Sequence, residues 1–289
     1  MSACAAVLSA GSVPSAPLWH YTGADGLRGI VQDVAIHATH YRFTNDESEL
    51  VEGEAATRRA CVELAKEEGD PVRRTLFTEL ADFSKSLALT KRTDVFIACL
   101  TEAKDSLVQW SGYRHRGTGY AIALRLSPTH WDPDADELDA SVMFAQVIYN
   151  RKAFIRLVKQ QLLQFAVIHD RYRSYGNAAM NAIQAWMLQE CASLSPRLKQ
   201  ACFAHEREWR IIVSAPREKQ NFLKFRSRPD GTLVPFVSLP LESGCVAGVC
   251  CGPAHAGQQE AKVMAARLLL REHGYAEHIV RPSGIPFCG

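Results

Sequence analysis

The sequence has no hydrophobic run long enough to cross a bilayer and little excess charge of either sign. A membrane-spanning helix needs about 20 consecutive apolar residues, and no segment of the chain approaches that length. The net charge is only +2. This value indicates no general affinity for nucleic acid or anionic membranes, although it leaves room for a local basic patch. We therefore expect a globular protein of the cytoplasm that does not contact a membrane.

Several catalytic signatures are missing as well. The chain contains neither the Gly-x-Ser-x-Gly elbow of serine hydrolases nor the glycine pattern of a Rossmann nucleotide site. His37 and His40 look like a chelating pair, but on a strand an offset of three residues directs their rings to opposite faces. The sequence therefore predicts no metal site.

The nine cysteines are an odd number and are scattered along the chain. Such usage is typical of buried thiols in a reducing compartment rather than of a disulfide framework. Cys245, Cys250 and Cys251 lie in an apolar segment and are expected to pack as small core hydrophobes. No cysteine has an activating neighbour in the sequence, so thiol catalysis is not indicated.

The chain alternates short apolar strands with longer helical segments in no regular order. Residues 1–17 are small and polar, and we expect a flexible N-terminal tail there. From residue 18 to residue 289 the pattern is neither a βαβ repeat nor a run of short strands, which favours a single α+β domain. Helical periodicity predicts two helical insertions in this domain, at about residues 47–90 and 151–200.

The segment from Ala204 to Val213, AHEREWRIIV, is the most informative part of the chain. If it is a strand, alternation places Glu206, Glu208 and Arg210 on one face. Three charges on one face of a strand that ends in core residues indicate a surface that is solvated, ion-paired or part of a site. A catalytic carboxylate and a structural ion-pair ladder both fit this pattern.

Two further segments carry candidate ligand contacts. His20, Tyr21 and Thr22 end a short predicted strand, where a side chain reaches a cleft or makes a structural hydrogen bond. Trp110 and Tyr113 are three residues apart, so on a helix they share one face. There they would either wall a planar ligand or pack in the core.

Together these pieces resemble a widespread bacterial family known as a domain of unknown function. Its members share a His-Tyr-Thr start, an Asn-Asp pair before a helix, an Asp-x-Leu-x-x-Trp-x-x-Tyr segment, a Gly-Tyr-Ala-Ile strand and a Glu-x-Glu-Trp-Arg strand. In this chain the pieces are His20–Thr22, Asn45–Asp46, Asp105–Tyr113, Gly119–Ile122 and Glu206–Arg210. Each piece alone is unspecific, and the ordered set over residues 18–255 carries the resemblance.

The order of an early histidine at a strand end, an aromatic segment in the middle and a late glutamate on a strand more distantly resembles the ADP-ribosyltransferase superfamily. That resemblance implies a split, mostly antiparallel sheet with helical insertions, which holds NAD as a substrate in a cleft. By this resemblance His20 would contact the adenosine-side ribose or a neighbouring hydroxyl of NAD, with Tyr21 and Thr22 as further NAD-binding residues of the same segment. Trp110, Tyr113 or Tyr120 would stack on the nicotinamide, and Arg210 would orient the acid or bind phosphate.

The resemblance also implies a catalytic acid in the Glu-x-Glu segment. Breaking the bond between nicotinamide and ribose develops positive charge on the ribose, which a fixed carboxylate stabilises. This acid is Glu208 or Glu206. We favour Glu208 because it lies deeper in the predicted strand, where its rotamer is easier to fix.

The expected function is therefore an NAD-dependent ADP-ribosyltransferase that modifies a macromolecular acceptor, either protein or nucleic acid. A bacterial toxin or an antiphage-defence effector is the setting that such an activity fits. Two alternatives stay open at this point. One is an NAD glycohydrolase, in which water is the acceptor, and the other is a nucleotide-sensing or interaction module without turnover.

Overall fold

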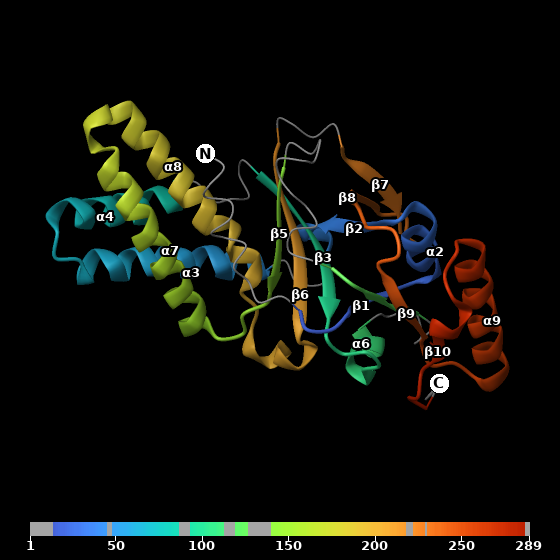
Figure 1. Ribbon diagram of the computed structural model, residues 1–289. Helices are drawn as coiled ribbons and strands as arrows, with labels where there is room; N and C mark the ends of the chain where they lie inside the picture. Colours follow the sequence, from blue (N-terminus) through green and yellow to red (C-terminus); the bar gives the residue numbers. More distant parts are fainter. Residues whose placement is uncertain are drawn as a thin grey trace.

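A ten-stranded, mostly antiparallel sheet forms the centre of the molecule (Figure 1). The computed structural model describes residues 14–44, 48–86, 93–112, 119–126, 140–217, 222–228 and 230–286. The strands are β1 (Leu18–Thr22), β2 (Ala35–His40), β3 (Thr93–Thr101), β4 (Tyr120–Leu124), β5 (Ser141–Gln146), β6 (Glu208–Pro216), β7 (Lys224–Ser227), β8 (Leu233–Pro240), β9 (Val246–Cys251) and β10 (Val280–Pro282). Among these strands β9 and β10 pair in parallel and the other pairs are antiparallel. The predicted combination of helices with a mostly antiparallel sheet is confirmed.

Helices lie at both ends of this sheet. They are α2 (Ala24–Asp33), α3 (Ser48–Glu67), α4 (Pro71–Ser86), α6 (Leu107–Gly112), α7 (Arg151–Arg171), α8 (Asn177–Ser193) and α9 (Ala256–Glu272). Short 3-10 helices are η1 (Tyr41–Phe43), η2 (Arg173–Tyr175), η3 (Ser195–Arg197), η4 (Ala201–Glu206) and η5 (Glu277–Ile279). In Figure 1, α3, α4, α7 and α8 form a group beyond β5, whereas α2 and α9 lie beside β9 at the other end of the molecule.

The group of α3, α4, α7 and α8 has a hydrophobic core of its own. Phe77 of α4, Phe154 of α7 and Met187 of α8 are fully buried in it. Asn150 caps the start of α7, because its side chain accepts a hydrogen bond from a backbone N–H in the first turn. The two segments predicted as helical insertions thus supply these four helices, which pack on one another.

Helix α3 approaches η3 very closely at Gly53. A Cβ atom at this position would overlap the backbone carbonyl of Ser195. Glycine lacks that atom, so the two backbones can meet. The chain then runs from η3 through η4 into β6. The helical group therefore fixes the position of the segment that leads into the charged start of β6.

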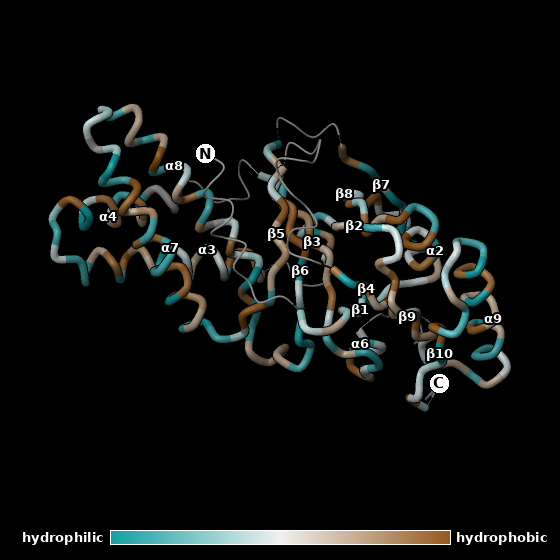
Figure 2. Tube along the Cα trace, in the orientation of Figure 1, coloured by the Kyte–Doolittle hydropathy of each residue, from teal (hydrophilic) through white to brown (hydrophobic). Residues whose placement is uncertain are grey.

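Alternation along β3 divides its side chains between the two faces of the sheet. Phe96 and Leu100 join the large core that also contains residues of α2 and α9. Val95 and Ile97 face the opposite way, into a smaller cluster with Ile212 of β6. In Figure 2 the tubes of β5 and β6 are brown over much of their length. Strands covered on both faces are expected to have such continuous apolar runs.

The sheet branches at β3. β6 pairs with β3 along all of its nine residues. β2 pairs with β3 at Phe96 and Ile97, whereas the register of β1 places Trp19 opposite Thr101. β6 occupies one edge of β3. The other edge is shared by β1 and β2, which separate from each other between Ile97 and Thr101 of β3. Cys99 lies at the point where the two halves of the sheet diverge.

Two strands differ from the prediction. β6 begins at Glu208 rather than at Glu206, because Arg207 has a φ of 44° and ends η4 in the left-handed region. Glu206 therefore belongs to η4 and does not share a strand face with Glu208 and Arg210, which corrects the predicted three-residue ladder. β7 was not predicted, since Lys224–Ser227 contains a single apolar residue and lies at the edge of the sheet.

Candidate functional site at the branch of the sheet

The charged residues at the start of β6 form an ion-pair cluster. Arg210 Nε donates to Glu208 Oε1 at 2.7 Å, and Arg210 Nη2 donates to Oε2 of the same carboxylate at 3.1 Å. This is a bidentate pair, which has favourable geometry and strength. Lys199 Nζ donates to Glu208 at 2.9 Å and to Glu206 at 2.6 Å. We call Lys199, Glu206, Glu208 and Arg210 the β6 cluster.

The β6 cluster is buried at one end and reaches solvent at the other. The side chains of Arg210 and Glu208 are 3% and 5% exposed, whereas that of Glu206 is 22% exposed. Burial would raise the pKa of Glu208, but Arg210 and Lys199 outweigh burial and lower the pKa to about 2. Glu208 is thus an ionised carboxylate whose charge is balanced by two cations.

Cys99 links the β6 cluster to β1. Its backbone carbonyl accepts a hydrogen bond from His20 Nδ1 at 2.9 Å, and its side chain lies close enough to Glu208 for the carboxylate charge to act on the thiol. Burial, and then the charge of Glu208, raise the pKa of Cys99 well above its usual range. Cys99 therefore remains a thiol, and His20 and Glu208 contact the same residue of β3 from two strands.

His20 is neutral in this position. Burial lowers its pKa, the hydrogen bond to Cys99 opposes that effect, and the positive charge of Arg226 lowers the pKa further. A carbonyl oxygen only accepts hydrogen bonds, so we assign the ring proton to Nδ1. Nε2 then carries a lone pair that can accept a hydrogen bond from a hydroxyl group.

Trp110, a member of the predicted aromatic wall, is part of the protein core. Trp110 is 3% exposed and packs edge-on against Tyr21, with the ring centroids 4.6 Å apart. Its Nε1 donates to Asp105 Oδ1 at 2.7 Å. The Tyr21 hydroxyl donates to the carbonyl of Ala103 at 2.9 Å. For Trp110 this packing favours the second possibility that the helical spacing left open, in which the ring belongs to the core.

The remaining predicted ligand contacts lie apart from the β6 cluster or outside the described residues. Tyr120 is buried in the large core, and Lys262 Nζ lies 5.2 Å from the centroid of its ring. The side chain of Thr22 fills the space beside Gly26 at the start of α2. Tyr113 falls outside the described residues. The predicted residues that the structure brings to the branch are His20, Glu206, Glu208 and Arg210.

A second group of side chains at the branch was missed by the sequence analysis. The ring of His37 on β2 lies 4.2 Å, centroid to centroid, from Phe236 on β8. The guanidinium of Arg226 on β7 lies 5.6 Å from the same ring and donates to Thr39 Oγ1 at 2.8 Å. The charge of Arg226 acts on both His37 and His20. Nothing in the sequence around Arg226 indicates this role, because the unpredicted strand β7 supplies it.

His37 and His40 occupy opposite faces of β2, as their spacing predicts. His37 contacts Phe236, whereas His40 Nε2 lies 3.4 Å from Asp94 Oδ1. Across the described ranges, no three or more His, Cys, Asp or Glu side chains gather in a way that would hold a metal ion. The same part of the chain has no helix with the length and hydrophobicity needed to span a membrane.

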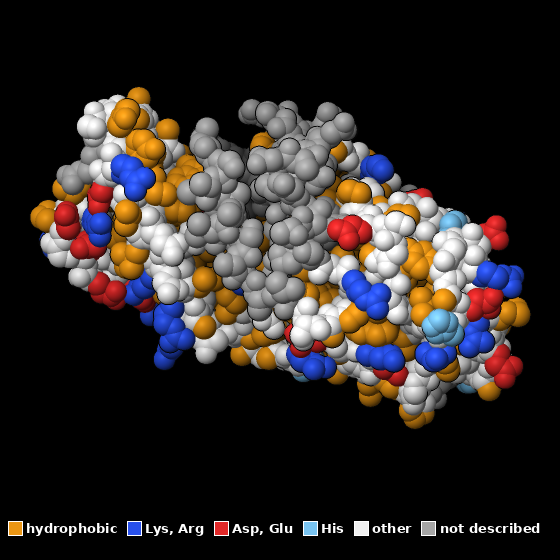
Figure 3. Space-filling model, in the orientation of Figure 1, with side chains coloured by type: hydrophobic (Ala, Val, Ile, Leu, Met, Phe, Trp, Pro, Cys, Tyr) orange, Lys and Arg blue, Asp and Glu red, His pale blue; other side chains and the backbone are white. Residues whose placement is uncertain are grey.

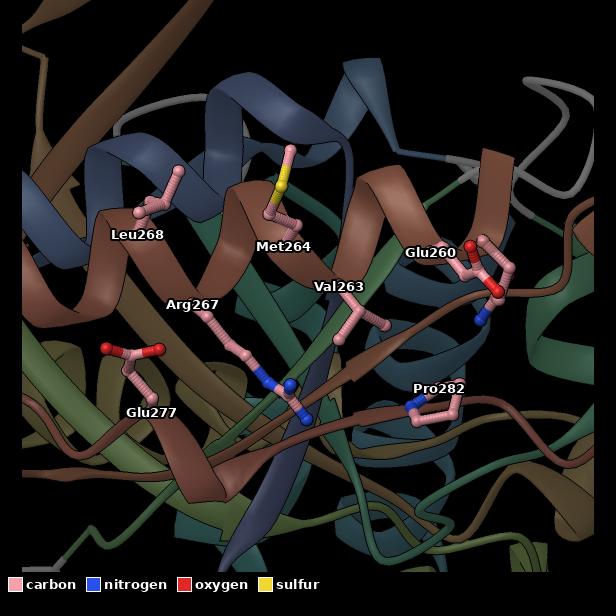
Figure 4. A pocket seen from close by; sticks show the side chains of 8 residues that line it. Glu260, Val263, Met264, Arg267, Leu268, Glu277 and Pro282 are labelled. Atoms are coloured by element: carbon pink, nitrogen blue, oxygen red, sulfur yellow. The ribbon is translucent and has the colours of Figure 1, made fainter. Parts of the chain in front are cut away.

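Two surface cavities lie away from the branch. One has a volume of about 480 Å³ and runs along α9, where Val263, Arg267 and Pro282 are among its lining residues (Figure 4). The other has a volume of about 450 Å³ and is lined by residues of α3 and α4 together with Arg151. Neither cavity is lined by a predicted site residue. On the face drawn in Figure 3, basic and acidic side chains are interspersed rather than separated into large patches.

One segment of the chain is similar to a described protein family. No curated protein and no solved structure matches the chain. The match covers residues 109–211 and so includes Trp110, Glu206, Glu208 and Arg210, whereas His20 lies outside it. The matching model is that of the family described as Protein of unknown function (DUF2971).

Proposed function

We propose that the protein is an NAD-dependent ADP-ribosyltransferase that modifies a macromolecular acceptor. The observation that carries this proposal is that His20 and Glu208 both lie beside Cys99, at the point where the sheet branches. A branched antiparallel sheet with a histidine on its first strand and an acid at the start of a later strand is the arrangement that the resemblance to ADP-ribosyltransferases implies. The family match of residues 109–211 is compatible with it and names no reaction.

The chemistry of the branch suits a dinucleotide. His20 Nε2 is available to accept a hydrogen bond from a ribose hydroxyl, because Nδ1 is used by Cys99. In the proposed reaction the bond between ribose C1′ and the nicotinamide nitrogen breaks, and the nicotinamide leaves with the bonding electrons. A nucleophile of the acceptor forms the new bond to C1′ and loses a proton. A carboxylate beside the ribose stabilises the positive charge that develops there.

We assign the contact with the ribose to Glu206 and a positioning role to Glu208. Glu208 is 5% exposed and is already bound by Arg210 and Lys199. A carboxylate with two cationic partners has little negative potential left for a substrate. Glu206 is 22% exposed and shares Lys199 with Glu208. Its position at the solvent end of the cluster makes it the better candidate acid.

The closed geometry of Glu208 also favours a second candidate function. A buried, fully paired cluster that joins β6 to η3 and η4 is what a structural anchor requires. In that case the protein is a nucleotide-binding or interaction module without turnover. An NAD glycohydrolase differs from the first proposal only in using water as the acceptor.

The setting that we propose is the bacterial cytoplasm, in a toxin or an antiphage effector. The cysteines that the structure describes are free, and most of them are buried. Unpaired thiols are typical of a reducing compartment.

Incubation of the purified protein with NAD labelled in its ADP-ribose part, with and without cell extract, tests the proposal. We expect label on a macromolecule in the wild type. Glu206→Gln should lower the transfer rate by about 100-fold or more, with an unchanged melting temperature. Glu272→Gln, at an exposed position near the end of α9, is the matched control and should transfer normally.

Other results would contradict the proposal in distinct ways. Free ADP-ribose as the labelled product would identify a glycohydrolase. NAD that raises the melting temperature without being consumed would identify a binding module, since a ligand that binds the native state stabilises it. Transfer by Glu206→Gln at the wild-type rate would remove the assignment of the acid.

A further inference from the structure

Strand β7 places two basic side chains on one face of the sheet beside the branch. Its register sets Lys224 opposite Phe236 and Arg226 opposite Val234 on β8. Opposed residues of an antiparallel pair share a face. The register of β2 with β8 in turn sets Thr39 opposite Phe236. Lys224 and Arg226 therefore face the same side as the outward residues of β2.

Contacts on this face hold Arg226 in a defined position. Arg226 Nη2 donates to Thr39 Oγ1 at 2.8 Å, and the guanidinium lies 5.6 Å from the centroid of the Phe236 ring. His37 packs on the same ring at 4.2 Å. Stacking on an aromatic ring and a single hydrogen bond orient a guanidinium while leaving other N–H groups able to donate.

The positive charge of this group is not balanced by ion pairs. In the part of the chain that the structure describes, neither Lys224 nor Arg226 forms an ion pair with a carboxylate. Burial and then the charges of Arg226 and Lys224 lower the pKa of His37, and the nearby carboxylate of Asp33 opposes them without reversing the shift. Two cations that are held together without an ion-paired carboxylate create a local field that attracts an anion.

An edge strand also carries charges for another reason, since lysine and arginine prevent it from pairing with another chain. That role requires charge alone. It does not require a guanidinium that lies over the Phe236 ring and is hydrogen-bonded to Thr39, nor one whose charge acts on His20. The arrangement is thus more specific than edge protection demands.

We propose that Arg226, with Lys224 and His37, binds the diphosphate of the dinucleotide at the branch of the sheet. This inference rests on the proposed function, because it names the contact for one part of the same substrate. The planar, forked guanidinium matches the geometry of phosphate oxygens.

Binding of ADP-ribose, which contains the diphosphate but no nicotinamide, tests the inference without requiring turnover. Titration calorimetry on the full chain should give an affinity for Arg226→Gln about 10- to 100-fold weaker than that of the wild type, the loss expected for hydrogen bonds to a charged group. Arg226→Lys keeps the charge without the fork and should be intermediate. Arg156→Gln, at an exposed arginine of α7, is the control and should bind like the wild type.

The outcomes separate this inference from the proposed function. Wild-type affinity of Arg226→Gln for ADP-ribose, with labelled transfer intact, would overturn the inference and leave the function standing. Weakened binding in Arg226→Gln together with no consumption of NAD by the wild type would support the diphosphate site and overturn the transferase. Displacement of ADP-ribose by a short single-stranded oligonucleotide but not by pyrophosphate would overturn the inference, because it would assign the group to an acceptor's phosphates. A wild type that binds neither ADP-ribose nor pyrophosphate would overturn both.

Discussion

Replacement of Glu208 by glutamine should strongly destabilise the fold. The change leaves Arg210 buried, 3% exposed, and removes the carboxylate that accepts two of its hydrogen bonds. The pKa of Glu208 falls from an ordinary value of 4.5 to about 2, and at about 1.4 kcal/mol per pH unit this corresponds to about 3 kcal/mol at neutral pH. Breaking a buried ion pair by removal of one partner typically costs about 3–5 kcal/mol.

Urea unfolding of four proteins at pH 7 measures this effect. The wild type, Glu208→Gln, Arg210→Met and the double variant form a mutant cycle. Each single change should cost about 3 kcal/mol or more, and the double change should cost clearly less than the sum, because no uncompensated charge remains on β6. Strictly additive losses, or single losses below about 1 kcal/mol, would refute an ion pair that stabilises the start of β6.

The same pair predicts how stability depends on pH. Because the pKa of Glu208 is lowered by folding, its contribution is fully present above pH 4.5 and is lost as the pH falls toward 2. The stability gap between the wild type and Glu208→Gln should therefore narrow as the pH falls through this window. A gap that stays constant from pH 5 to about pH 2 would contradict the lowered pKa.

Two backbone positions give further predictions, both measured by denaturant unfolding. Arg207→Gly should raise the free energy of unfolding by about 1 kcal/mol, because glycine adopts the left-handed φ of 44° without strain; Arg207→Ala is the control and should give no such gain. Gly53→Ala should cost about 1–3 kcal/mol, since its methyl group would overlap the carbonyl of Ser195. Gly29→Ala, in a helix where the added Cβ would make only an ordinary contact with the Asp33 side chain at 3.8 Å, should instead stabilise by up to about 1 kcal/mol. Equal effects at the two glycines would contradict the close approach at η3.

Local pattern predicted most of the regular structure. The helices around residues 47–68 and 151–195 have clear apolar periodicity and capping residues, and the structure has α3 at Ser48–Glu67 and α7 and α8 at Arg151–Ser193. The long apolar run after Glu208 predicted β6. β7 escaped prediction because an edge strand buries little, so Lys224–Ser227 has no apolar alternation to detect.

The candidate site was harder to predict because its contacts are distant in sequence. The residues of the Glu-x-Glu segment and His20 stand out as motifs, but nothing in the sequence indicates that both contact Cys99. Arg226 reaches the branch only through the pairing of β7 with β8 and of β8 with β2. The spacing of Trp110 from Tyr113 is compatible with a ligand-binding wall, but Trp110 is buried against Tyr21 and belongs to the core.

The choice between Glu206 and Glu208 shows how depth in a strand works against a catalytic acid. Depth was the reason to favour Glu208, since a buried rotamer is easier to fix. On a buried strand face, however, residues two apart are neighbours, so Arg210 pairs with Glu208 at 2.7 Å. The left-handed Arg207 interrupts the strand between the two acids and leaves Glu206 at the solvent end. Glycine or asparagine usually marks such a conformation. Because the residue here is an arginine, nothing in the sequence indicated the break in the strand between Glu206, which is partly exposed, and Glu208, which is buried.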